Sequence, residues 1–81
     1  MSNEYQVLFF THTGAIKFSK IMKKNNISCE LMPVPRTLSS SCGVSACIHY
    51  NKQVEELISD QTEKIFQKIK GNYSLIYTAE D

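Results

Sequence analysis

The stretch Tyr5–Lys24, YQVLFFTHTGAIKFSKIMKK, decides how the fold begins. Five of its first six residues are aromatic or aliphatic, which is typical of a strand. Further on, apolar residues recur three or four positions apart and lysines fill the positions between them, so a helix with one buried face is predicted. Thr11 or Thr13 can cap this helix through its hydroxyl. The two asparagines at 25 and 26 are expected to end it.

Two strands and a loop are predicted after this helix. The segment Ile27–Val34 looks extended, and Pro33 and Pro35 each remove a backbone donor, so it is expected at a sheet edge or to leave the sheet near its end. Arg36–Gly43 is rich in turn-forming residues and is predicted as a loop. Val44–Tyr50 alternates between apolar and small or polar side chains, which indicates a half-buried strand.

The remaining residues predict a second helix and a last strand, Tyr73–Thr78. Asn51 can cap this helix, Gly71 suits the position after a helix end, and the pattern permits a break at Asp60-Gln61. The apolar residues at helical spacing are Val54, Leu57, Ile58, Ile65, Phe66 and Ile69. The predicted order is β-α-β-β-α-β, the ferredoxin-like α+β pattern, with two helices on one face of a four-stranded antiparallel sheet.

Composition limits the classes of protein to which the chain can belong. Its 81 residues are expected to form one domain, residues 1–81. The net charge of +1 argues against nucleic acid as a partner. The apolar runs are far shorter than the ~20 residues of a membrane span, so no membrane partner is predicted. No secretory signal is visible, and a cytoplasmic protein is therefore expected.

The three cysteines, Cys29, Cys42 and Cys47, cannot all pair within the chain. In the cytoplasm they are expected to be free thiols. Their spacing, with that of the two histidines, does not match zinc ligands, so no metal site and no cofactor are predicted. Cys29 is expected in the core, whereas Cys47 and His49 share a strand face and are expected to be partly exposed.

The segment 33–43, PVPRTLSSSCG, holds the candidate site. A turn of small residues can aim several backbone N–H groups at one anion, and Arg36 can add a positive charge. These surroundings favour the thiolate of Cys42, which is the nucleophilic form. His12 can reach this loop if the turn after the first strand and the loop lie at the same end of the sheet. It could then act as a base or as a positively charged partner of the thiolate. The candidate residues around Cys42 are Arg36, Ser39, Ser40, Ser41, Gly43 and His12.

The motif PVPR-x-L-SSSCG, preceded by a strand, a Thr/His turn and a lysine-rich helix, resembles the selenium/sulfur carrier protein-like family over nearly the whole chain. The resemblance implies that Cys42 binds a sulfur or selenium atom as a persulfide or selenopersulfide. It implies a carrier rather than an enzyme, with a donor protein such as a cysteine desulfurase and an acceptor protein as partners. Cys47 departs from the family pattern, in which a non-cysteine, often basic, residue is common near that position.

Two other functions remain open on the residues alone. In the first, the serine-rich loop binds an anion and the open sheet face binds a partner, without any chemistry at Cys42. In the second, the chain is a thiol enzyme, which needs a base oriented by a third group, and His12 or His49 would have to serve. A homodimer through the open face, with Tyr50 or Tyr73 nearby, is also compatible with the pattern.

Overall fold

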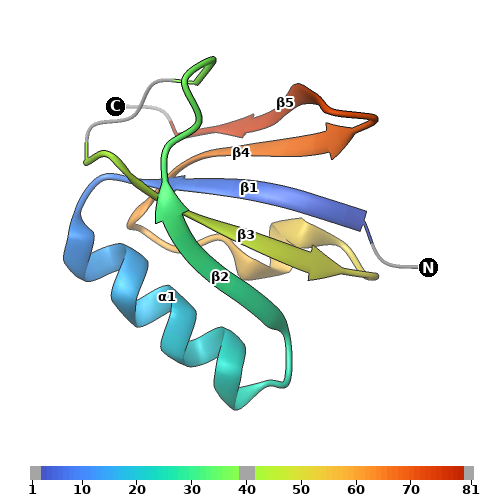
Figure 1. The fold of residues 1–81 in the computed structure, drawn as a ribbon. Helices are drawn as coiled ribbons and strands as arrows, with labels where there is room; N and C mark the ends of the chain where they lie inside the picture. Colours follow the sequence, from blue (N-terminus) through green and yellow to red (C-terminus); the bar gives the residue numbers. More distant parts are fainter. Residues whose placement is uncertain (1–2, 39–41, 80–81) are drawn as a thin grey trace.

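The computed structural model describes residues 3–38 and 42–79, and in these residues a five-stranded sheet packs against one α-helix (Figure 1). The elements in chain order are β1 (Asn3–Phe9), α1 (His12–Lys24), β2 (Ser28–Pro33), β3 (Val44–Tyr50), the 3-10 helix η1 (Val54–Leu57), β4 (Thr62–Ile69) and β5 (Asn72–Thr78). The strand order is β2-β3-β1-β4-β5, and every neighbouring pair is antiparallel. The central strand is therefore β1.

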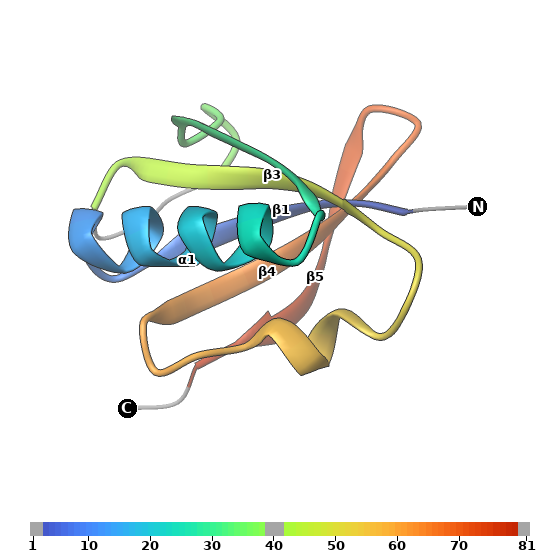
Figure 2. The ribbon, with the colours of Figure 1, turned by 90° about the horizontal axis from the view of Figure 1, so that it is seen from below.

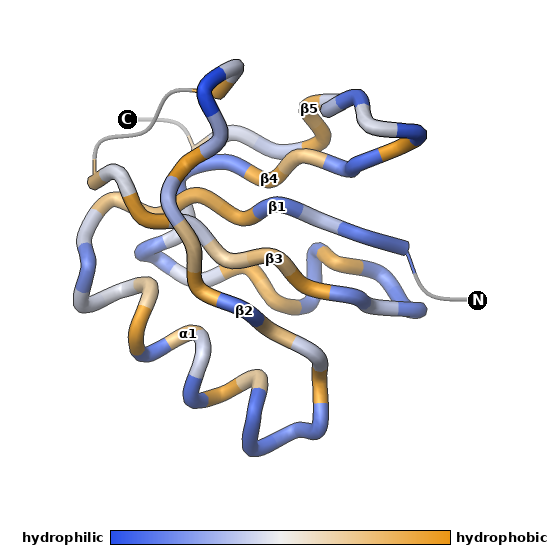
Figure 3. The backbone as a smooth tube through the Cα atoms, in the orientation of Figure 1, coloured by the Kyte–Doolittle hydropathy of each residue, from blue (hydrophilic) through white to orange (hydrophobic). Residues whose placement is uncertain are grey.

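The core lies between the sheet and α1. Val7 and Phe9 of β1 are almost completely buried and belong to one hydrophobic cluster with Phe18 of α1. The rings of Phe9 and Phe18 are tilted, with their centroids 5.0 Å apart. Figure 3 shows this concentration of hydrophobic residues along β1 and its neighbours. The second face of β1 is also buried, with Gln6 2% and Leu8 0% exposed.

The helix α1 begins and ends as the sequence predicts. Thr11 is the N-cap, and its hydroxyl accepts a hydrogen bond of 3.0 Å from the backbone N–H of Gly14. Asn26 adopts a positive φ of 58° directly after the helix, a conformation that asparagine tolerates better than most residues. The lysines of the last turn face the negative end of the helix dipole.

The two strands that flank the loop also agree with the prediction. β2 is an edge strand and ends at Pro33, as the missing backbone donors of the prolines require. β3 buries Ala46 and Ile48 toward α1. On the second face, Ser45 is buried and its hydroxyl accepts a 2.6 Å hydrogen bond from the Gln6 side chain. This bond fixes the start of β3 against β1.

The ferredoxin-like prediction is wrong, because the predicted second helix is a short 3-10 turn followed by a strand. Asn51 caps no α-helix, and the apolar spacing belongs to two different elements, η1 and β4. In β4, Ile65 pairs with Val7 and Phe66 pairs with Gln6, so the two residues lie on opposite faces of the sheet. Ile65 belongs to the core, whereas Phe66 packs against the ring of Tyr73 on the other face. The strand therefore has apolar residues on both faces, and their spacing imitates that of a helix.

The predicted helix end at Gly71 is a hairpin turn. Ile69 pairs with Asn72, and the two residues between them, Lys70 and Gly71, have φ values of 50° and 83°. A two-residue turn with positive φ at both positions matches the twist of the strands that it joins. β4 is thus one side of a β-hairpin, and the sheet gains the fifth strand that the sequence did not predict.

The segment 51–61 covers the part of the sheet that α1 leaves free. Val54 is 3% exposed within the same hydrophobic cluster as Phe18, and Leu57 and Ile58 pack against that cluster. Figure 2 views the sheet from this side, with α1 and η1 in front of it. Among the described residues, no helix is long and apolar enough to cross a membrane.

Candidate functional site

The candidate thiol lies at the end of the connection between β2 and β3. The N–H of Val34 donates to the carbonyl of Gly43 (3.1 Å), which closes the connection at its base, and the N–H of Leu38 donates to Pro35 (3.0 Å) to form a turn within it. Gly43 has a φ of +74°, which glycine adopts without strain. The chain can therefore turn sharply between Cys42 and the first residue of β3.

Cys42 is held on two sides. Its side chain is half-buried and packs against the edge of the hydrophobic core. The sulfur donates to the carbonyl oxygen of Val44 at 3.3 Å. The backbone carbonyl of Cys42 lies 2.8 Å from Nε2 of His12. The thiol is thus positioned by the start of β3, and its backbone by the start of α1.

The structure brings His12 to the loop, as the sequence permits. Because a carbonyl oxygen can only accept, the contact is a hydrogen bond when Nε2 carries the proton. His12 is the first residue of α1, so the helix fixes where its ring can reach. The ring contacts the backbone of Cys42, which indicates a positioning role.

The other predicted site residues are only partly placed. The Arg36 side chain is exposed, in the turn that Pro35 and Leu38 close. Gly43 follows Cys42 directly and carries the positive φ described above. Ser39, Ser40 and Ser41 lie outside the described residues, so the predicted anion-binding turn stays a prediction.

Cys47 is a different kind of thiol. Its sulfur donates to Oε2 of Glu4 at 3.3 Å, on the sheet face away from α1. Burial, the hydrogen bond to Glu4 and the negative charge of Glu4 together raise the pKa of Cys47 to about 11, although Lys68 acts in the opposite direction. Burial also raises the pKa of Cys29, which packs against the core. Both side chains are thereby favoured as thiols.

Sequence reasoning missed the charged groups around Cys47. Glu4 lies opposite His49 in β3 and opposite Lys68 in β4. Its carboxylate oxygens are 3.9 Å from Nε2 of His49 and 3.6 Å from Nζ of Lys68. These contacts depend on strand order and register, for which the sequence carries no local signal. The predicted partial exposure of Cys47 and His49 is confirmed.

A family model described as "Putative Se/S carrier protein-like" matches residues 4–78. The chain belongs to this family. No curated protein and no solved structure matches the chain significantly. Within this member of the Se/S carrier protein-like family, the three cysteines differ in their surroundings as described above.

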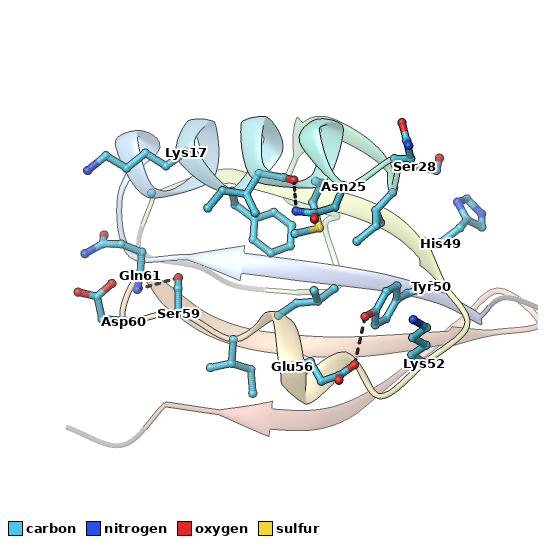
Figure 4. Close-up of a pocket in the computed structure, with 18 of the residues that line it drawn as sticks. Lys17, Asn25, Ser28, His49, Tyr50, Lys52, Glu56, Ser59, Asp60 and Gln61 are labelled. Atoms are coloured by element: carbon cyan, nitrogen blue, oxygen red, sulfur yellow. Dashed lines mark hydrogen bonds between the residues drawn. The ribbon is translucent and has the colours of Figure 1, made fainter.

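Two grooves border α1, one on each side. The smaller, of about 390 Å³, is lined mainly by apolar side chains and reaches the residues next to Cys42. Its lining residues are His12, Ile16, Leu31, Met32, Pro33, Gly43 and Val44. The larger, of about 1350 Å³, lies between α1 and the segment 51–61 (Figure 4). There the hydroxyl of Tyr50 donates to Glu56 at 3.1 Å. Since the smaller groove adjoins Cys42, it is the one relevant to thiol chemistry.

The described residues offer no site of the kind that holds a metal. Among residues 3–38 and 42–79, no three side chains of His, Cys, Asp or Glu come together as metal ligands do.

Proposed function

We propose that the protein carries a sulfur or selenium atom on Cys42, as a persulfide or selenopersulfide, between a donor protein and an acceptor protein. The observation that carries the proposal is that the three thiols of this Se/S carrier-like chain differ in their surroundings. Cys47 and Cys29 have raised pKa values, and a thiol that resists ionisation is a poor nucleophile. Cys42 lies at the end of a loop and beside a groove instead.

The proposed uptake step is an exchange at sulfur. Cys42 loses its proton, and the thiolate attacks the outer sulfur of a donor persulfide, R–S–SH. A new S–S bond forms as the donor's S–S bond breaks, and the departing R–S⁻ takes up a proton. Cys42 then carries –S–SH and the donor is R–SH, so atoms and electrons balance without an added oxidant. With selenium as the outer atom, the product is –S–SeH.

Ionisation of Cys42 also changes its contacts. The thiol donates to the carbonyl of Val44, and a thiolate has no proton to donate. The hydrogen bond to Val44 is therefore lost when the nucleophile forms. The bond between His12 and the Cys42 carbonyl does not involve the thiol proton, so it keeps the backbone in place through this step.

The surroundings of Cys42 would then hold the outer atom. A terminal persulfide is readily ionised, and backbone N–H groups around Gly43 together with Arg36 supply the donors that favour an anion. The serines at 39–41 complete this proposed set. Their role is hydrogen bonding rather than nucleophilic attack, because a serine nucleophile needs an adjacent base.

The test is a map of adducts by mass spectrometry. The reduced protein is incubated with a cysteine desulfurase and free cysteine, as wild type and as Cys42→Ser, and the cysteine-containing peptides are compared. We expect a gain of one sulfur atom on Cys42, which passes on when an acceptor thiol is added. Cys29 and Cys47 are internal controls for unselective modification. Equal labelling of Cys42 and Cys47 would overturn the proposal and favour the loop as an anion-binding or partner-binding site.

A further inference from the structure

The smaller groove beside Cys42 leaves large apolar side chains in contact with solvent. Ile16 of α1 is 48% exposed and Leu31 of β2 is 38% exposed, and both line the groove. His12, which holds the Cys42 carbonyl, lines the same groove. Exposed apolar residues next to a reactive group are typical of a surface that binds another molecule.

Two lysines lie along α1 beyond the groove. Lys20 follows Ile16 by four positions, which places both on one stripe of α1. Lys23 follows Lys20 by three positions and continues that stripe, and its charge lowers the pKa of Cys29 in β2. α1 contains no acidic residue. We name His12, Ile16, Lys20, Lys23 and Leu31 the α1–β2 surface.

The nearest acidic residue of β2 points away from this surface. Glu30 pairs with Cys47, whereas Leu31 pairs with Ala46 of the core. Since successive residues of a strand face opposite sides of the sheet, Glu30 lies on the face that carries Glu4. The carboxylate of Glu30 thus lies on the opposite face of the sheet, whereas Lys20 and Lys23 share a helix stripe with Ile16, which lines the groove.

We propose that the α1–β2 surface docks the protein that exchanges sulfur with Cys42, through a segment of that protein that combines acidic and apolar side chains. The inference rests on the proposed function of Cys42. Acidic side chains complement Lys20 and Lys23, and an apolar side chain covers Ile16 and Leu31. Charge complementarity raises the rate of encounter, and the apolar contact retains the partner beside the thiol.

The probes are synthetic peptides that carry a cysteine persulfide. One has aspartates and leucines around the cysteine, and a second has lysines in place of the aspartates. A small neutral persulfide, that of N-acetylcysteine amide, contacts neither the lysines nor the groove. The rate at which each donor adds sulfur to Cys42 is followed by mass spectrometry. With the wild type at low salt, we expect the acidic peptide to react roughly tenfold faster than the lysine peptide.

Each test variant has a control that makes the same substitution at an exposed residue outside the α1–β2 surface. Lys20→Glu is matched by Lys52→Glu, an exposed lysine beyond the far end of β3. Ile16→Ser is matched by Ile21→Ser, whose side chain is 53% exposed on the same helix but lines the larger groove. We expect Lys20→Glu to slow the acidic peptide roughly tenfold, and Ile16→Ser to slow it about fivefold. The matched variants should react as the wild type does.

The outcomes separate this inference from the proposed function. The docking surface is supported if Lys20→Glu and Ile16→Ser lower the rate with the acidic peptide and leave the rate with the neutral persulfide unchanged. If Lys20→Glu and Ile16→Ser react with the acidic peptide as their matched variants do, the docking surface is wrong and the carrier proposal stands. If the neutral persulfide leaves Cys42 of the wild type unmodified, the carrier proposal fails and this inference fails with it.

Discussion

The Nε2 atom of His12 lies 2.8 Å from the carbonyl oxygen of Cys42, although the two residues are 30 positions apart in the chain. The bond joins the first residue of α1 to the last turn before β3. It fixes the backbone on which the candidate thiol is carried, and it leaves the sulfur itself to interact with Val44.

His12→Ala should therefore slow sulfur uptake at Cys42. Loss of the bond should also lower the free energy of unfolding by about 0.5–1 kcal/mol, since the contact is exposed. His12→Gln keeps an N–H donor and should restore part of the uptake rate. His49→Ala removes another exposed histidine, outside the loop, and serves as the control. Equal rates for the alanine and glutamine variants would contradict a positioning role.

Cys47 should resist alkylation until the solution is strongly alkaline. Burial and Glu4 raise its pKa from the ordinary 9.0 to about 11, and only the thiolate reacts with iodoacetamide. The rate should rise between pH 9 and pH 11, as measured by peptide mass spectrometry. The same shift favours the thiol in the folded state, so its contribution to stability is complete below pH 9 and is lost as pH rises through 11.

Two variants should move the pKa of Cys47 in opposite directions. Glu4→Gln removes a negative charge and should make the thiol react faster at pH 9. Lys68→Ala removes the charge that lowers the pKa and should make it react more slowly. Unchanged rates in both variants would mean that burial alone sets the reactivity.

Gly14→Ala should destabilise the protein, although alanine is the better helix former. A Cβ at position 14 would lie 2.6 Å from Cβ of Gln61. The gain in helix propensity, at most ~1 kcal/mol, is offset by an overpacking cost of roughly 1–3 kcal/mol. Urea denaturation should show a lower midpoint. Gln61→Ala keeps the Cβ and should not restore it, whereas Gln61→Gly should relieve the clash.

Lys70→Asn should stabilise the hairpin between β4 and β5. Lys70 has a positive φ of 50°, which asparagine adopts more readily than lysine, and Asn-Gly is the preferred pair for such a turn. We expect an increase of about 0.5–1 kcal/mol in the free energy of unfolding, from the usual range of turn optimisation. Lys52→Asn makes the same exchange outside the turn, and an equal gain there would exclude the turn as the cause.

Local signals sufficed for α1, β2 and β3. Thr11 caps the helix with its own hydroxyl, and Pro33 ends an edge strand because it lacks a backbone donor; both effects act within a few residues. The second helix was predicted wrongly for a non-local reason. Ile65 packs in the core and Phe66 packs against Tyr73 of the neighbouring strand, and the sequence alone does not show which strand will be that neighbour.

The candidate site, too, could be predicted only where its signal is local in the sequence. Cys42 and Gly43 stand out in a run of small residues, and their motif is visible without a structure. The contact between His12 and Cys42 requires the β1–α1 connection and the β2–β3 connection to lie at the same end of the sheet. The sequence permitted this arrangement but could not establish it. Glu4 beside Cys47 follows only from the register of β1 against β3.

The central position of β1 bears on how the chain reaches its native state. Its two neighbours, β3 and β4, begin 35 or more residues after β1 ends, by the element bounds. Loops must close over that distance before the middle of the sheet exists, so most stabilising contacts form late, and folding is expected to be slow for a chain of this length. During synthesis, the apolar strand β1 has no partner until β3, which ends at Tyr50, has left the ribosome, and its second edge stays unpaired until β4 ends at Ile69. In that interval the segment 5–9 is a binding site for chaperones and a starting point for aggregation.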